Sequence, residues 1–274
     1  MRDAPTATEG YADVNGARLW YEIAGVGPAL VMAHGHLIDS GQWDSQFVEF
    51  AREFRVVRYD ARGFGRSDKP AQPFAFHEDL RGLLGFLGVE RTLLMGCSGG
   101  GATVIDLSLA HPDMVRGLVL VGAGLPGYQF SDSPPPKIVA MREAHERGDI
   151  DGAVELGLQI WTDGERRRPD QVDPIARERT REMMKRQLSR PRVAADVRRL
   201  DPPASTRLDE IRMPTLVVVG GDDWQPIHDI ADQLTKEIPG ARKLMIPDAG
   251  HHPNMEHPEQ FNERVLSFLR SIPA

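Results

Sequence analysis

The segment Gly96-Cys97-Ser98-Gly99-Gly100 is the clearest candidate for chemistry in this sequence. It follows the apolar run 93–95, which predicts a strand, and it precedes a stretch that predicts a helix. A sharp turn between a strand and a helix exposes the serine hydroxyl, and glycines on both sides let the backbone approach closely. We therefore predict that Ser98 is a nucleophile. A glycine-rich phosphate loop or a plain turn are the alternatives.

Cys97 is the other nucleophilic side chain in this motif. At the centre of the motif it would need a small residue at position 95, where the sequence has Met95. We expect Cys97 to act as a small apolar residue behind the turn.

A serine hydroxyl is a weak nucleophile until a base accepts its proton. Of the nine histidines, His251 is placed best, because it follows the predicted strand 243–246 and so belongs to the same edge of the sheet as Ser98. His252 and His257 lie close by in the sequence, but each would need a different turn to reach that edge.

The base itself needs a third group that fixes its tautomer and stabilises the imidazolium. Asp222 and Asp223 follow the predicted strand 215–219, again at the carboxyl edge. We expect one of them to reach His251 and the other to cap the helix that follows.

Short apolar runs alternate with longer amphipathic stretches over most of the chain. Buried strands joined by amphipathic helices predict an α/β fold with a doubly wound, mostly parallel sheet. Asn15-Gly16 predicts a tight hairpin between the first two predicted strands, ahead of the parallel part of the sheet. The predicted strands are 11–14, 17–23, 29–33, 55–59, 92–95, 118–121, 215–219 and 243–246, and the predicted helices between them are 42–52, 76–87, 99–110, 227–238 and 259–269.

Residues 125–205 interrupt this alternation with three helix-like segments at 138–147, 151–161 and 175–188 and no strand-like run. We expect residues 1–124 and 206–274 to form the core and 125–205 a helical cap. The cap would cover the carboxyl ends of the strands, where ligands bind in open α/β sheets. A solvated helical excursion is the alternative. Candidates for a substrate pocket beneath the cap, or else for cap core, are Trp161, Tyr128 and Phe130.

The chain order Ser98, then an aspartate, then His251, together with this turn, resembles the α/β-hydrolase fold superfamily, and the likeness extends over nearly the whole chain. Residues 60–67 resemble the family's turn after the second parallel strand. Gly220-Gly221-Asp222-Asp223 resembles its acid turn, in which the fourth residue is the acid, so the resemblance favours Asp223.

His34-Gly35 resembles the oxyanion loop of the same family. By this resemblance the backbone N–H groups of His36 and Gly99 would form the oxyanion hole, which stabilises the charge that develops on a carbonyl oxygen. We expect the side chain of His36 to fill the loop, and contact with the substrate is the alternative.

The resemblance implies a cofactor-free serine hydrolase that acts on a small carboxylic ester or lactone. Residues 58–63 and the general layout resemble the 3-oxoadipate enol-lactonases and related esterases. Carbon–carbon bond hydrolases often carry Trp after the catalytic histidine, where this chain has His252, and cofactor-free perhydrolases carry Met after the serine, where it has Gly99. Both remain alternatives, as does a member of the fold that binds a small molecule without catalysis.

Composition narrows the other classes of function. The 274 residues carry a formal net charge of −7. Proteins that bind nucleic acids usually present a basic surface, so this charge argues against that class. One cysteine permits neither an intrachain disulfide nor a thiolate zinc cluster. We see no signal peptide and no run long enough to cross a bilayer, so we expect a cytoplasmic protein without a membrane partner, and a homo-oligomer stays open.

Three further motifs are weaker signals. Residues 122–127 match a dinucleotide fingerprint, but prolines block the helix that should follow, so we interpret the glycines as the exit into the cap. His34, His36 and Asp39 have metal-ligand spacing, yet the serine machinery already accounts for the loop, and we expect no metal site. We expect residues 166–168, three arginines, to form a solvated corner.

Overall fold

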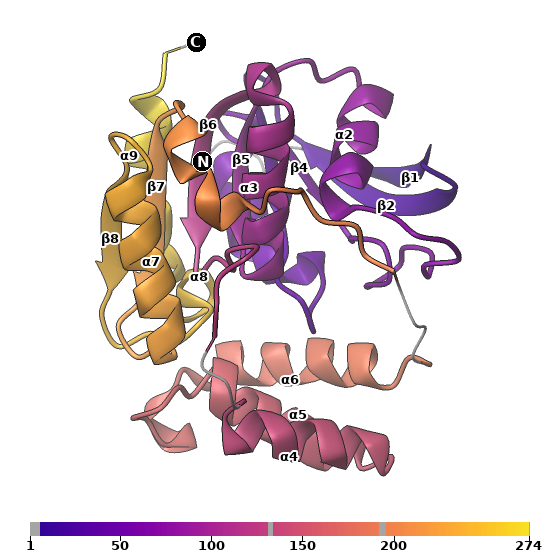
Figure 1. Ribbon diagram of the computed structural model, residues 1–274, viewed down its shortest axis with the longest axis vertical. Helices are drawn as coiled ribbons and strands as arrows, with labels where there is room; N and C mark the ends of the chain where they lie inside the picture. The colour runs from indigo at the N-terminus through magenta and orange to yellow at the C-terminus, as the bar shows by residue number, and fades with distance from the viewer. Residues whose placement is uncertain (1–5, 131–133, 192–195, 274) are drawn as a thin grey trace.

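The computed structural model describes residues 6–130, 134–191 and 196–273, which are built around one eight-stranded sheet (Figure 1). The order across the sheet is β1-β2-β4-β3-β5-β6-β7-β8. β2 is antiparallel to β1 and β4, and the other neighbouring strands run parallel, which confirms the predicted fold class. The strands are β1 (Thr8–Val14), β2 (Ala17–Ala24), β3 (Ala29–Ala33), β4 (Arg55–Tyr59), β5 (Thr92–Cys97), β6 (Val115–Val121), β7 (Thr215–Gly220) and β8 (Arg242–Ile246).

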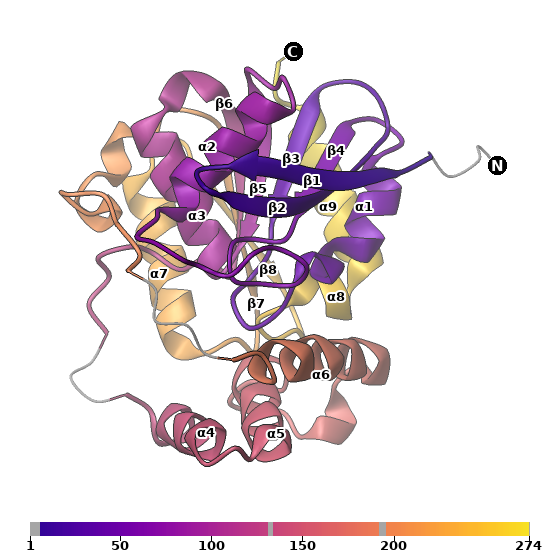
Figure 2. The same ribbon diagram turned by 90° about the vertical axis from the view of Figure 1, so that its right-hand side faces the viewer.

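Helices cover both faces of this sheet (Figures 1 and 2). One face packs against α2 (Phe76–Phe86), α3 (Gly99–Ala110) and α7 (Gln225–Glu237), and the other against α1 (Asp44–Phe50) and α9 (Pro258–Arg270). Every residue of β5 and β7 is buried, as expected for central strands with helices on both sides.

Three helices form a separate layer beyond the carboxyl ends of the parallel strands, on the chain between β6 and β7 (Figure 1). They are α4 (Pro136–Glu146), α5 (Ile150–Trp161) and α6 (Pro174–Leu188). Asp149 and Asp173 begin α5 and α6 by accepting hydrogen bonds from backbone N–H groups of the first turn. We call residues 134–191 the cap layer.

Polar side chains of α6 attach the cap layer to the core. Arg186 pairs with Asp39 at 2.9 Å, and Arg179 pairs with Asp44. The amide of Gln187 donates to the carbonyl of Gly63 at 3.1 Å. These contacts close one side of the space between the cap layer and the sheet edge.

Most predicted elements lie within a few residues of the observed ones. Asn15-Gly16 forms the expected hairpin turn, with φ values of 48° and 75°. The predicted helix 42–52 is wrong in part, because the chain first forms a 3-10 turn at Ser40–Trp43 and then the shorter α1. The single turn α8 (Pro253–Glu256) was not predicted, since four residues carry no helical periodicity. Within the described ranges, no helix has the length and apolarity needed to cross a lipid bilayer.

The fold also contains one ion pair that is almost fully buried. Arg62 holds the carboxylate of Asp79 through Nε and Nη2 at 2.7 and 2.8 Å, and their side chains are 1% and 3% exposed. Replacing Arg62 by Met leaves this carboxylate buried without its partner. We expect the free energy of unfolding to fall by about 3–5 kcal/mol in urea denaturation.

Arg52→Met is the matched control for this prediction. Its ion pair with Glu49 is solvent-exposed, and such pairs contribute about 1 kcal/mol or less. Equal losses of stability in the two variants would contradict the prediction.

Candidate active site

Ser98 lies in a strained turn between β5 and α3. Its backbone has φ 51° and ψ −116°, a conformation that side chains other than glycine rarely adopt. A Cβ at Gly96 would collide with the carbonyl of Gly100, and a Cβ at Gly100 would collide with that of Ala33. The two glycines are therefore required by close backbone contacts, as the sequence motif predicts.

His251 and Asp223 form a buried pair at the same edge of the sheet. Nδ1 of His251 lies 2.9 and 3.1 Å from the carboxylate oxygens of Asp223. A carboxylate only accepts, so Nδ1 carries the proton and Nε2 keeps its lone pair. Nε2 is buried and has no hydrogen-bond partner among the described residues, Ser98 included. This nitrogen is free to accept a proton once a hydroxyl turns toward it.

Residues of β5 and β6 bring Ser98 and His251 to one place. The N–H of Ser98 donates to the carbonyl of Val121 at 3.0 Å. A Cβ on the next residue, Gly122, would lie 3.0 Å from Nδ1 of His251. Gly122 directly follows β6, where the chain leaves the sheet. The imidazole of His251 occupies the space that a side chain at this position would need.

Cys97 is fully buried, and its thiol faces the carbonyl of His251 with the sulfur 3.9 Å from the oxygen. Burial raises the pKa of this thiol to about 12. Cys97 is thus a packing residue behind the turn, as predicted, and not a competing nucleophile.

Residues 34–36, predicted above to be the oxyanion loop, are fixed by hydrogen bonds of the His34 ring and the Gln42 side chain. Nε2 of His34 accepts from the N–H of Ala61 at 2.9 Å, so Nδ1 donates to the carbonyl of Gly35 at 2.7 Å. The N–H of Gly35 donates to the side chain of Gln42. With both nitrogens of His34 engaged and Asp39 paired to Arg186, these side chains serve the loop and its attachment to α6 rather than a metal.

A buried polar network connects the oxyanion loop to the segment that follows His251. Asn254 donates to the carbonyl of Gln42 and to the side chain of Gln46, both at 3.0 Å. Gln46 donates in turn to Asn262 at 2.7 Å. Because these amides satisfy one another in the interior, the two loops are held in one arrangement.

The backbone N–H groups of His36 and Gly99 donate to no other residue in the part of the chain that the structure describes. The imidazole of His36 lies directly over Gly99, where it would collide with any Cβ. Its ring stacks on Phe64 with 5.1 Å between the ring centroids, and it lines a cavity.

The cap layer holds the histidine loop from the opposite side. The N–H of His251 donates to the carbonyl of Trp161 at 2.9 Å, and the Trp161 ring lies 4.8 Å from the imidazole. Arg167 donates to the carbonyl of Asp248 at 2.6 Å and pairs with Glu256 at 2.7 Å. Glu256 accepts from the N–H of Gly250 at 2.8 Å, so Arg167 and Glu256 clamp the loop.

Two expectations from the sequence are therefore wrong. Arg167 is not part of a solvated corner: its side chain is 8% exposed, because the histidine loop and Glu256 surround it. Asp222 does not cap α7, since it pairs with Arg166 at 3.2 Å and Arg167 at 3.7 Å.

The three aromatic residues named as pocket candidates lie together on the side of His251. Phe130 stacks on Trp224 at 5.8 Å, Trp224 meets Trp161 edge-on at 5.8 Å, and Tyr128 meets Phe130 at 5.0 Å. Trp161 lies next to the imidazole of His251, and the cavity that His36 lines includes none of the three predicted pocket residues. We call Tyr128, Phe130, Trp161 and Trp224 the aromatic wall.

Residues 30–264 match the Alpha/beta hydrolase family. This chain belongs to that family. The structural features described above are the sheet order, the strained turn at Ser98 and the His251–Asp223 pair.

The chain is similar to several hydrolases of known name. It is 30% identical to the 2-hydroxy-6-oxononadienedioate/2-hydroxy-6-oxononatrienedioate hydrolase 2 of Pseudomonas putida over 92% of each chain. Its structure resembles the enol-lactonase of Burkholderia xenovorans LB400 with a TM-score of 0.76 and 25% identity, covering 96% of this chain and 100% of that one. Est816, described as an N-acyl homoserine lactone degrading enzyme, gives a TM-score of 0.76 and 27% identity, covering 94% and 100%.

The clamp on the histidine loop generates a prediction. Arg167→Met removes the contacts to Asp248 and Glu256, so the imidazole loses part of its positioning. We expect kcat for 4-nitrophenyl butyrate to fall about ten- to hundredfold, with KM changing little. Arg168→Met is the control, because Arg168 is exposed and Asp170 is its one ion-pair partner among the residues that the structure describes. Equal kcat values for the two variants would show that the clamp does not position the histidine.

Proposed function

We propose that this chain is a serine hydrolase that cleaves a small carboxylic ester or lactone through an acyl-enzyme on Ser98. The observation that carries the proposal is the buried His251–Asp223 pair, whose free Nε2 lies at the sheet edge that holds the strained serine. The similarity to an enol-lactonase and to a lactone-degrading enzyme, each over nearly the whole chain, supports the bond type.

The mechanism follows from the positions of these groups. Oγ of Ser98 attacks the substrate carbonyl while Nε2 of His251 takes its proton, and Asp223 stabilises the imidazolium that forms. The N–H groups of His36 and Gly99 donate to the oxyanion of the tetrahedral intermediate. His251 then gives the proton to the leaving alkoxide, and a water molecule deprotonated by His251 releases the acyl group.

Substitutions of the proposed triad test these roles. We expect His251→Ala to abolish turnover of 4-nitrophenyl butyrate. We expect Asp223→Asn to lower kcat about 10⁴-fold, because a neutral amide can donate to Nδ1, which favours the wrong tautomer, and does not stabilise the imidazolium. Asp222→Asn and His257→Ala serve as controls and should keep most of the turnover, as should His252→Ala, whose ring is buried beside His251 but bonds to neither partner of the pair. If Asp222→Asn proved the more damaging change, the assignment of the acid would be off by one residue.

A fluorophosphonate probe separates the enzyme from a binding protein of the same fold. We expect stoichiometric labelling of the wild-type chain and none of Ser98→Ala, because only an activated serine attacks the phosphorus. Unlabelled wild-type protein with an intact thermal transition would favour the binding protein. Lactones should turn over faster than linear 4-nitrophenyl esters of similar size if the chain is a lactonase, and the reverse order favours an esterase.

Hydrolysis of a carbon–carbon bond is the second candidate. It is favoured by the identity to the Pseudomonas putida hydrolase over 92% of each chain. Turnover of a vinylogous diketone that exceeds turnover of both lactones and esters would select this reaction and reject the ester or lactone proposal.

A further inference from the structure

The loop that follows β3, residues 34–37, ends in a strained residue. Leu37 has a φ of 69°, a left-handed conformation that bulky side chains rarely adopt. A residue keeps such a conformation only where the surrounding structure fixes it. The preceding residue is His36, whose backbone N–H we propose as an oxyanion donor. The contacts that fix this loop therefore decide where that N–H points.

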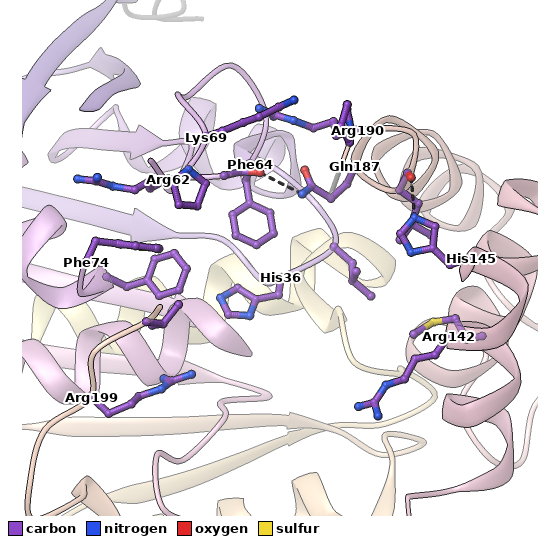
Figure 3. A pocket seen from close by; sticks show the side chains of 18 residues that line it. His36, Arg62, Phe64, Lys69, Phe74, Arg142, His145, Gln187, Arg190 and Arg199 are labelled. Atoms are coloured by element: carbon purple, nitrogen blue, oxygen red, sulfur yellow. Dashed lines mark hydrogen bonds between the residues drawn. The ribbon is translucent and has the colours of Figure 1, made fainter. Parts of the chain in front are cut away.

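The cavity side of the loop supplies no directional contact. His36 lines a cavity of about 490 Å³ between the core and the cap layer, and its ring projects into that space (Figure 3). The imidazole packs against Phe64 and Phe76, with 5.1 and 5.3 Å between ring centroids. It forms no hydrogen bond with a residue that the structure describes. These contacts position the imidazole, so the backbone of the loop must be held from the interior.

Gly35 is held on the interior side at both of its peptide groups. Its N–H donates to Oε1 of Gln42 at 2.9 Å, and its carbonyl accepts from Nδ1 of His34 at 2.7 Å. The peptide bond between Gly35 and His36 is trans and planar, so the N–H of His36 points away from that carbonyl. A displacement of Gly35 would therefore redirect the N–H of His36.

The same glycine lies beside the proposed nucleophile. A Cβ built on Gly35 would be 3.5 Å from Cβ of Ser98 and 3.7 Å from Oε1 of Gln42. Gln42 is thus separated from Ser98 by a single residue. A shift of Gly35 away from Gln42 would change the distance between the proposed donor and the serine.

The side-chain amide of Gln42 is buried and has one possible orientation. A backbone N–H can only donate, so Oε1 must face Gly35 and Nε2 must face the other way. On that side Oδ1 of Asn254 lies 3.4 Å from Nε2. Asn254 uses its own Nδ2 to donate to the carbonyl of Gln42 and to Oε1 of Gln46, both at 3.0 Å, so its Oδ1 is left to accept from Gln42.

Gln46 offers a matched comparison within the same network. It is the same residue type, it is also buried, and it lies four positions further along the chain. Its amide contacts Asn254 and Asn262 but forms no hydrogen bond with residues 34–37. A role in packing alone would be common to both glutamines, whereas a role in the loop would belong to Gln42.

We infer that Gln42 is a positioning residue of the proposed oxyanion hole: its side-chain carbonyl holds Gly35, so that the strained loop aims the N–H of His36 at the substrate oxygen. Asn254 fixes the direction of the Gln42 amide. Gln42 acts through Gly35 and not on the substrate itself. The inference rests on the proposed function, because the oxyanion forms only when Ser98 attacks a carbonyl.

The first experiment compares Gln42→Leu with Gln46→Leu. Both variants leave buried partners without a hydrogen bond, so we expect similar losses of thermal stability. We expect kcat for 4-nitrophenyl butyrate to fall about ten- to hundredfold in Gln42→Leu, with KM changing less than about twofold. In Gln46→Leu we expect kcat to fall less than about threefold, because the hydrogen bond to Gly35 remains.

A trifluoromethyl ketone reports on the oxyanion hole directly. Oγ of Ser98 adds to the carbonyl of 1,1,1-trifluoroheptan-2-one while the proton goes to His251, so the adduct carries the oxyanion. Heptan-2-one is the matched ligand that binds without forming the adduct. We expect Gln42→Leu to raise Ki for the trifluoromethyl ketone by about the factor by which kcat/KM falls, and to leave Ki for heptan-2-one as in the wild type.

Gln42→Glu keeps the test valid if the leucine variant does not fold. A protonated carboxyl group can accept from Gly35 and donate to Asn254 as the amide does, whereas the ionised group meets Oδ1 of Asn254 without a proton. We expect the ratio of variant to wild-type kcat to be near one at acidic pH and to fall as pH rises. Gln46→Glu should show a ratio that does not change with pH.

The outcomes separate this inference from the proposed function. If the wild type turns over esters and the two leucine variants have equal kcat and Ki values, the positioning role is overturned and the hydrolase stands. A ratio for Gln42→Glu that is independent of pH would overturn it as well. A wild type that neither turns over esters nor is inhibited by the trifluoromethyl ketone would refute the hydrolase, and the positioning role with it.

Discussion

The imidazole of His251 is held from the core and from the cap layer at once, and the geometry of the site depends on this double hold. Asp223, at the end of β7, fixes the proton on Nδ1. The carbonyl of Trp161, at the end of α5, accepts from the backbone N–H of the same histidine. The side chain and the backbone of His251 are therefore positioned by different layers, and a displacement of either layer would alter the direction of Nε2.

The remaining parts of the site are rigid for different reasons. Ser98 is presented by a strained backbone that two glycines make possible. The oxyanion loop is fixed by His34 and by the amide network from Gln42 to Asn254. Preorganised donors of this kind need no rearrangement when charge develops on the substrate, which is how such sites lower a barrier. The network also couples the loop at His34–His36 to the segment after His251, so the two sides of the proposed site share one support.

The sequence predicted the sheet and the proposed catalytic residues because both depend on local patterns. Short, uniformly apolar runs such as β5 and β7 between turn signals are typical of central strands, and the Gly-x-Ser-x-Gly motif is typical of a sharp strand-to-helix turn. The contacts of Arg167 could not be predicted in this way. Arg167 meets the histidine loop 81 positions away in the chain, and three adjacent arginines are usually solvent-exposed.

The contact between His36 and Gly99 makes these two positions mutually dependent. An imidazole at 36 occupies the volume that any side chain at 99 would need, so the residue after the nucleophile is restricted by a residue 63 positions earlier in the chain. Evolution or engineering toward a larger residue at 99 must therefore turn the side chain at 36 away or make it smaller. Among homologues, a bulky side chain should occur at one of these two positions at a time.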